Sequence, residues 1–163
     1  MSTNMSNEKQ NILQLVKQLK GCKFLEIIGK SRLGTLYLIE HSVYGRCVLK
    51  YFKDELAKKQ RFAKKILNET KLGYKIKHPF CGKIYQIDYQ PKLFMIREWV
   101  DGKALTEHIE EKNLSPLDAT NLIIKISFGV QAAYNFRVKT RNLKPSNIFV
   151  GPDNSPKIVD FVL

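Results

Sequence analysis

Lys50 and Glu69 are charged residues at positions where the hydrophobic pattern predicts burial. Lys50 lies inside the apolar run 47–52, which predicts a strand. Glu69 follows Phe62 by seven positions and Ile66 by three, so the three share one face of a predicted helix. A buried charge is costly unless an opposite charge pairs with it. We therefore predict a Lys50–Glu69 ion pair, which would satisfy both groups and leave the lysine directed at a phosphate.

The elements that must position this pair follow from the periodicity of the apolar residues. Alternating apolar and polar residues predict strands, and apolar residues three or four positions apart predict helices. Short connections between the first three strands favour an antiparallel meander. The predicted strands are 24–28, 34–39, 47–52, 82–89 and 93–100, and the predicted helices are 11–20, 54–77, 104–112 and 115–136.

The helix predicted over 115–136 carries apolar residues nearly all round its axis, among them Leu122, Ile124 and Phe128. A helix that is apolar on every side is expected to be buried on every side. The residues that follow it are too few to cover it. We therefore expect a protein partner or self-association to cover this part of the chain.

A second group of chemically informative residues lies near the end of the chain. Residues 141–148 read R-N-L-K-P-S-N-I, and Asp160-Phe161-Val162 begins thirteen positions after Asn147. The pattern L-K-P-x-N at this distance before D-F is improbable by chance. A glycine-containing turn, the lysine strand and the glutamate helix precede it in that order. Over residues 22–163 the chain therefore resembles the protein kinase family.

The resemblance implies an α+β fold in two parts. Residues 21–100 would form a kinase-like N-lobe, an antiparallel five-stranded sheet with one helix. Residues 101–163 would form an incomplete, mainly helical C-lobe that holds the catalytic loop and the metal-binding turn. Residues 1–20 would be an N-terminal extension with a short helix. The resemblance thus implies a truncated kinase-like domain.

The resemblance also implies a site for ATP and Mg²⁺. Asn142 stands at the position of the catalytic base, and Lys144 at that of the lysine that contacts the transferred phosphate. Asn147 and Asp160 stand where the family holds its metal ions. The residues implied for nucleotide binding are Gly29, Ser31, Gly34, Leu36, Val48, Lys50, Glu69, Glu98, Val100 and Phe149.

Three residues around this site depart from the family pattern. Asn142 replaces the catalytic aspartate, and a carboxamide can accept a hydrogen bond but cannot take up a proton at neutral pH. Ser31 replaces the second glycine of the phosphate-binding turn, where a side chain is expected to weaken the cradle of backbone N–H groups. Val162 replaces the last glycine of D-F-G, and its β-branched side chain restricts the backbone.

Two further departures concern an internal apolar stack behind the site. Thr140 and Gly73 replace two of its members, whereas Ile84 and Phe161 are retained. With two of four members small or polar, we do not expect a stably closed active arrangement.

Arg97 stands at the back of the implied adenine pocket, directly before the hinge 98–100. An arginine there would block the pocket, or reach toward a phosphate or toward Glu69. If the alignment is displaced by one residue, Arg97 would instead lie on the surface.

Composition narrows the class of protein. A chain of 163 residues that is 44% hydrophobic fits one packed domain, or one and a fraction. The net charge of +13 attracts polyanions in general, but it is spread along the chain, so nucleic-acid binding is not expected. Three cysteines far apart predict free buried thiols in a reducing compartment. Because no secretion signal and no membrane-spanning stretch are evident, we expect a cytoplasmic location.

The leading interpretation is a truncated protein-kinase-like domain that binds ATP with Mg²⁺, transfers phosphate weakly or not at all, and acts as a pseudokinase scaffold. One alternative is a residual or partner-completed Ser/Thr protein kinase that transfers the γ-phosphate of ATP. A second alternative is a basic interaction module whose Lys-rich helix, 53–77, binds an acidic partner.

Overall fold

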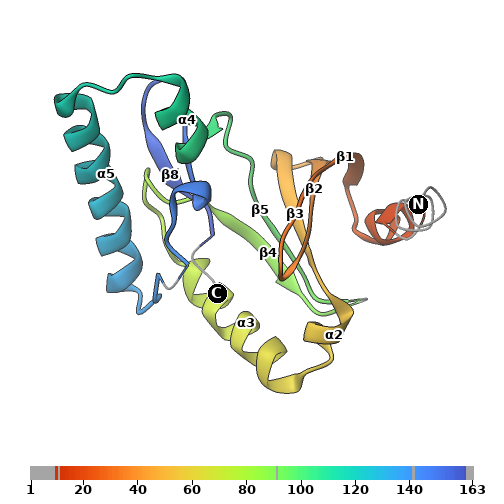
Figure 1. Cartoon of the computed structure of the whole chain (residues 1–163). Helices are drawn as coiled ribbons and strands as arrows, with labels where there is room; N and C mark the ends of the chain where they lie inside the picture. Colours follow the sequence, from red (N-terminus) through yellow and green to blue (C-terminus); the bar gives the residue numbers. More distant parts are fainter. Residues whose placement is uncertain (1–9, 11, 91, 141, 161–163) are drawn as a thin grey trace.

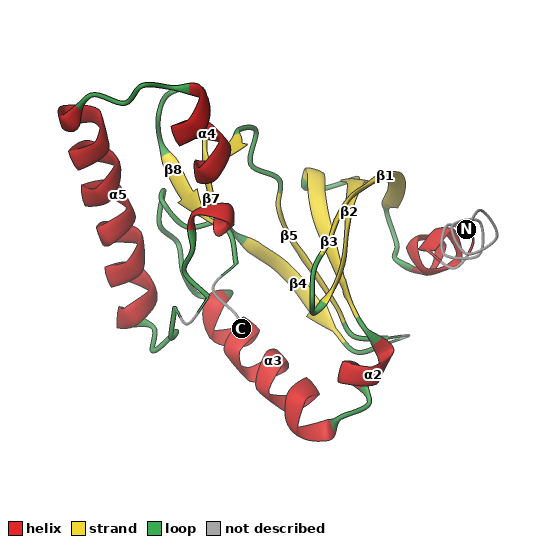
Figure 2. Ribbon diagram, in the orientation of Figure 1, coloured by secondary structure: helices red, strands yellow, loops and turns green. Residues whose placement is uncertain are grey.

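The computed structural model describes residue 10 and residues 12–90, 92–140 and 142–160. Its main feature is a five-stranded antiparallel sheet in the order β1-β2-β3-β5-β4, with helices packed against it (Figures 1 and 2). The strands are β1 (Cys22–Lys30), β2 (Gly34–His41), β3 (Gly45–Phe52), β4 (Ile84–Asp88) and β5 (Phe94–Glu98). The predicted α+β class and the five-stranded antiparallel sheet are confirmed.

One face of this sheet forms a core with the N-terminal helix, in which residues 12–18 are helical. Leu49 of β3 pairs with Tyr37 of β2 and with Ile96 of β5, so the three side chains form a row on the same face. The helix buries Ile12, Leu15, Val16 and Leu19 against this face. The N-terminal helix therefore covers one side of the sheet.

The opposite face of the sheet packs against helix α3 (Gln60–Gly73). The buried residues of α3 recur every three or four positions, and they are Ala63, Ile66, Thr70 and Gly73. A single helix was predicted over 54–77, but the structure has two, because α2 (Asp54–Ala57) ends early. The chain is extended at Lys59, with φ −77° and ψ 102°, and this breaks the helical hydrogen bonding. The single-helix prediction is therefore wrong.

The second part of the chain contains α4 (Leu105–Glu111), α5 (Pro116–Asn135) and a small three-stranded sheet. α5 begins after Ser115, whose Oγ accepts a hydrogen bond from the backbone N–H of Asp118 at 3.1 Å. The small sheet was not predicted, because strands of two or three residues carry no readable periodicity. Its strands are β6 (Lys103–Ala104), β7 (Ile148–Val150) and β8 (Pro156–Ile158).

The described residues cover α5 on one side only. Its buried residues, Leu122, Gly129 and Ala133, face the rest of the molecule. The exposed apolar residues of α5 are Leu117, Ile123, Ile124, Phe128 and Tyr134. Figure 1 shows α5 at the far end of the molecule from the N-terminal helix. The expectation that the described chain cannot cover this helix is confirmed, and no helix within these residues is long and apolar enough to cross a bilayer.

The three cysteines form no disulfide in the described structure. Cys47 and Cys81 are buried, and Cys22 is half-buried. Burial raises the pKa of the Cys47 thiol to about 11 and that of the Cys81 thiol to about 12. Both thiols therefore stay protonated at neutral pH and act as small apolar side chains, as the sequence predicts.

We expect Leu15→Ala to destabilise the fold by about 2–5 kcal/mol, because it opens a cavity between the N-terminal helix and the sheet. Leu15 is 3% exposed, whereas Leu13 on the same helix is 38% exposed. Leu13→Ala is therefore the matched control, with an expected change within about 0.5 kcal/mol. Denaturant unfolding of both variants measures the difference, and equal effects would show that the helix is not docked on the sheet.

Candidate functional site

A cleft of about 280 Å³ lies where the five-stranded sheet meets the second part of the chain. Its volume is near the lower end of the range for small-molecule pockets, about 300–1,000 Å³. Six predicted site residues line it: Leu36, Val48, Val100, Asn147, Phe149 and Asp160. The other lining residues are Ile28, Arg97, Trp99, Glu107, Ser146 and Val159.

The large sheet places Val48 in this cleft and Lys50 next to it on the same face; Lys50 itself is not a lining residue and reaches the cleft through its contact with Asp160. Side chains two positions apart on a strand share a face, and Lys50 is directly opposite Leu36 on β2. All three therefore lie on the face that looks away from the N-terminal helix. Phe149 of β7 contributes to the lining from the second part of the chain. Together these apolar groups form a slot suited to a flat ring.

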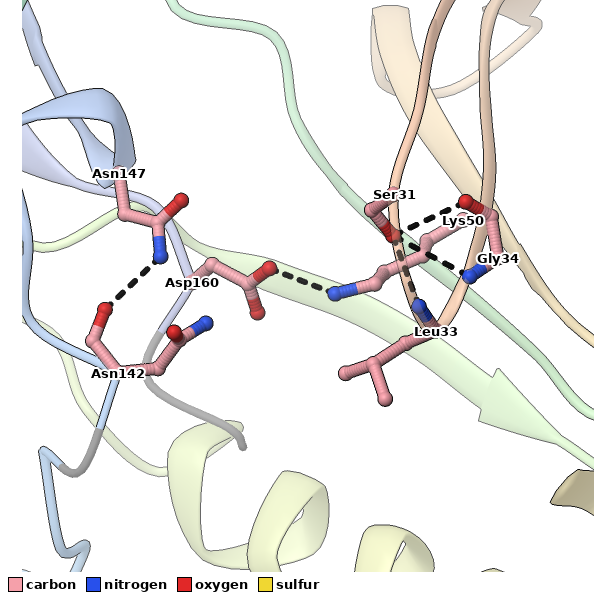
Figure 3. A network of polar contacts seen from close by, with 7 residues as sticks. All are labelled: Ser31, Leu33, Gly34, Lys50, Asn142, Asn147 and Asp160. Atoms are coloured by element: carbon pink, nitrogen blue, oxygen red, sulfur yellow. Dashed lines mark hydrogen bonds and ion pairs between the residues drawn. The ribbon is translucent and has the colours of Figure 1, made fainter.

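Lys50 forms a buried ion pair with Asp160 at the polar end of the cleft (Figure 3). The distance from Lys50 Nζ to Asp160 Oδ2 is 2.6 Å, and the two side chains are 3% and 17% exposed. The two residues are 110 positions apart in the sequence. A charge this deeply buried requires a partner, and Asp160 supplies it.

The predicted Lys50–Glu69 ion pair is therefore wrong for the structure described. After Ile66, the next buried residue of α3 is Thr70, four positions further along the helix. Glu69 precedes Thr70, so it lies at the edge of the buried face and is only half-buried. Thr70, which takes the inward position, is fully buried, and its Oγ1 has no hydrogen-bond partner among the described residues. Lys50 instead pairs with a carboxylate that is itself largely buried.

The β7–β8 hairpin brings Asn147 and Asp160 to one end of the cleft. Asn147 directly precedes β7, and the backbone N–H of Val159, just after β8, donates to the Asn147 carbonyl at 3.0 Å. The side-chain Nδ2 of Asn147 donates to the backbone carbonyl of Asn142 at 2.8 Å, which leaves its Oδ1 unused by that contact (Figure 3). Asp160 Oδ1 is buried and has no hydrogen-bond partner among the described residues.

Both oxygens are of the chemical type that magnesium takes as ligands. Mg²⁺ takes oxygen ligands and is usually held by one or two carboxylates together with substrate phosphates and water. No group of three or more His, Cys, Asp or Glu residues suited to a metal occurs among the described residues. The chain could therefore hold Mg²⁺ through Asp160 and Asn147 only if phosphate and water complete the coordination.

The side chain of Ser31 forms hydrogen bonds with backbone groups of its own turn, between β1 and β2 (Figure 3). Its Oγ accepts hydrogen bonds from the backbone N–H groups of Leu33 at 3.3 Å and Gly34 at 3.2 Å, and donates to the Gly34 carbonyl at 2.9 Å. Those N–H groups are the donors that a phosphate would use. The turn residues Gly29, Ser31 and Gly34 are not among the residues that line the cleft.

Gly34 is the turn residue that must be glycine. A Cβ at this position would lie 1.9 Å from the backbone oxygen of Tyr51 on β3. A Cβ at Gly29 would approach only a Leu36 methyl at 3.9 Å, an ordinary contact. Close packing of β2 on β3 therefore accounts for Gly34 without any ligand.

Two residues of the predicted catalytic loop, Asn142 and Lys144, are not among the residues that line the cleft. Asn142 is half-buried and is connected to Asn147 by the hydrogen bond to its carbonyl. Lys144 is exposed and precedes the short 3₁₀ turn Pro145–Asn147. The roles predicted for these two side chains stay predictions. Arg141, Phe161 and Val162 lie outside the described residues.

Arg97 is buried and lines the cleft, so the alternative that placed it on the surface is wrong. Its Nη1 donates to the backbone carbonyl of Glu98 at 3.0 Å. Burial lowers the pKa of the Arg97 guanidinium from its ordinary value, and the Asp160 and Glu98 carboxylates oppose that shift.

The side chain of Glu98 is engaged elsewhere. It pairs with Lys157 and accepts a hydrogen bond from the backbone N–H of Lys83 at 2.9 Å. Glu98 is not among the cleft-lining residues, and its hydrogen bond with Arg97 is made through the backbone carbonyl.

At Gly73, a Cβ would lie 2.9 Å from Ile84 Cδ1. Ile84 thus fills the space that a larger residue at 73 would need. The two stack members Gly73 and Ile84 are therefore in contact, while Phe161 lies outside the described residues, so the expectation that the arrangement is not stably closed stays a prediction.

Several cleft residues were not predicted. Ile28, directly before Gly29, and Trp99, inside the predicted hinge, could have been included from their sequence position. Glu107 and Ser146 gave no signal, because α4 and the 3₁₀ turn bring them to the cleft only through tertiary packing.

The protein kinase domain model matches residues 22–163, so the chain belongs to the protein kinase family. Serine/threonine-protein kinase PrkC of Bacillus subtilis is 25% identical over 142 residues, which are 85% of this chain and 22% of that protein. Sperm motility kinase 3A of Mus musculus is 29% identical over 141 residues, 85% of this chain and 27% of that protein. Aurora kinase of Debaryomyces hansenii is 23% identical over 139 residues, which are 83% of this chain and 34% of that protein. The chain thus spans between about a fifth and a third of these relatives.

We expect Asp160→Asn to destabilise the fold by about 3 kcal/mol, because it leaves the buried Lys50 ammonium without a carboxylate. In a double-mutant cycle, Lys50→Met combined with Asp160→Asn should cost less than the sum of the single changes, since neither charge is then left unpaired. Denaturant unfolding of the four proteins measures the coupling.

The matched control is the exposed ion pair Lys92–Asp54, whose side chains are both 49% exposed. Lys92→Met should change the free energy of unfolding by about 0–1 kcal/mol. Additive effects in the Lys50–Asp160 cycle would mean that the buried pair does not form in solution.

Proposed function

We propose that this protein-kinase-like domain binds a magnesium–nucleotide complex, with ATP as the nucleotide implied by its family, and that phosphoryl transfer is absent or strongly impaired. The observation that carries the proposal is the buried Lys50–Asp160 pair at the end of an apolar slot. The slot suits a purine, and the charged end suits its phosphates. A pseudokinase role, as a scaffold or regulator, follows from binding without efficient transfer.

In this proposal each polar residue has a binding task. Lys50 holds a phosphate oxygen when the nucleotide enters, while Asp160 Oδ1 and Asn147 Oδ1 take the metal ion. A bound Mg²⁺ supplies neutralisation of the phosphate charge. Asn147 is oriented for its task by its hydrogen bond to the Asn142 carbonyl.

Two substitutions support the impaired transfer. Asn142 cannot accept the substrate proton, and the loss of a general base typically lowers a rate by about 10²–10⁴-fold. Ser31 uses the turn N–H groups of Leu33 and Gly34 itself, so these donors are unavailable for a phosphate unless the turn opens. Residual transfer is compatible with the site, because phosphoryl transfer depends mostly on positioning and electrostatics.

A second candidate is a Ser/Thr protein kinase that a partner completes. Lys144, Asn147 and Asp160 support it, because they are the residues that position phosphate and metal in the family. The third, a basic module for an acidic partner, rests on the net charge of +13 and on the Lys-rich segment 53–77.

Thermal unfolding with and without Mg-ATP tests nucleotide binding. A ligand at about 100 times its dissociation constant stabilises the folded state by about 2.7 kcal/mol. We expect a magnesium-dependent rise in Tm for the wild-type chain and none for Lys50→Met, compared with its own ligand-free baseline. Lys92→Met is the control that should keep the rise. No shift in a wild-type chain that unfolds cooperatively would contradict the proposed nucleotide site.

Restoring the base tests the impaired transfer. We expect Asn142→Asp to raise the rate of γ-phosphate transfer from radiolabelled ATP by about 10²–10⁴-fold, because a carboxylate can accept the substrate proton. Asn68→Asp, on the exposed side of α3, adds the same charge away from the cleft and should leave the rate unchanged. If Asn142→Asp gains nothing while nucleotide still binds, the missing base is not what limits transfer.

A further inference from the structure

Arg97 is a buried arginine whose hydrogen-bonding capacity is mostly unused. It is 8% exposed, and among the described residues its guanidinium makes a single hydrogen bond, from Nη1 to the Glu98 carbonyl at 3.0 Å. A guanidinium carries five N–H donors in a fixed planar fork. Its other nitrogens are not among the buried side-chain atoms of the described residues that lack a partner, so they keep contact with solvent in the cleft, where an acceptor of a ligand can replace water.

The two carboxylates that act most on the Arg97 charge do not supply that acceptor. Asp160 is paired with Lys50, and the Glu98 side chain is paired with Lys157 and the Lys83 backbone. Arg97 itself forms no ion pair with either of them in the described structure. Arg97 lines the cleft, so a ligand bound there can supply an acceptor for its remaining donors.

The position of Arg97 places it beside the apolar slot. It is the cross-strand partner of Val48, which lines that slot, and its Nη1 is held by the carbonyl of the next residue. Lys50 lies two positions along β3 from Val48 on the same face, so its pair with Asp160 adjoins the same wall of the cleft, while Val48 places the slot directly beside Arg97. A planar base in the slot would therefore present its edge to Arg97.

We propose that Arg97 makes the cleft selective for a 6-oxopurine nucleotide, with a guanine or hypoxanthine base, over an adenine nucleotide. Guanine offers two adjacent acceptors, O6 and N7, which match the arginine fork. Adenine carries an amino group at C6, which would set a donor against the Arg97 donors. The inference rests on the proposed nucleotide site and assigns its base preference.

Titration of the full chain with Mg-GTP, Mg-ITP and Mg-ATP by calorimetry tests this. We expect GTP and ITP to bind about 5- to 140-fold more tightly than ATP, the range that one arginine–guanine pair provides. ITP distinguishes the effect of O6 from that of the 2-amino group, because its base has O6 but no 2-amino group. ATP binding as tightly as GTP, or ITP binding no better than ATP, overturns the base preference alone. If none of the three nucleotides binds, the proposed nucleotide site is wrong, and so is the base preference that depends on it.

Arg97→Met tests whether this residue carries the preference. We expect the variant to lose most of the difference between GTP and ATP, whereas Arg46→Met, at an exposed position of β3, should keep it. An equal loss of affinity for both nucleotides would show that Arg97 contacts a phosphate, which overturns the proposal. If Arg97→Met does not unfold cooperatively, Arg97→Lys keeps the charge without the planar fork and should still weaken the preference.

Discussion

The ion pair between Lys50 and Asp160 is the interaction on which the rest of the site depends. It connects β3 of the large sheet with the residue that follows the β7–β8 hairpin, and it closes the cleft between the two parts of the chain. A buried ammonium cannot remain without a carboxylate, so the pair fixes how these parts meet. It also leaves Asp160 Oδ1 without a partner among the described residues, which is the feature that a metal ion would satisfy.

The departures from the kinase pattern affect two different functions. In the proposed function, Asn142 lacks the carboxylate that would take up a proton, while its backbone carbonyl accepts the hydrogen bond of Asn147. Ser31 and Arg97 change recognition, since one occupies the donors of the turn and the other places a cation at the wall of the slot. Under this proposal the chain keeps the groups implied for binding phosphate and metal, Lys50, Asn147 and Asp160, and lacks the group implied for proton exchange.

Sequence reasoning worked best where a pattern is long or a motif is ordered. The five strands, the start of α5 at Ser115 and the cleft positions of Val48, Phe149, Asn147 and Asp160 could all be predicted. It failed at Glu69, because helical periodicity does not distinguish the centre of a buried stripe from its edge, one residue away. The small sheet was missed because its strands are too short to show a period.

The sequence by itself determined the family, the sheet, and which residues carry charge or lack it at the site, since these depend on local patterns and residue chemistry. Only the tertiary structure decided the partner of Lys50, the closure of the turn by Ser31 and the burial of Arg97. The physical reason is that a buried charge takes whichever opposite group the fold brings within reach. For Lys50 that group is 110 positions away, where no local spacing can reveal it.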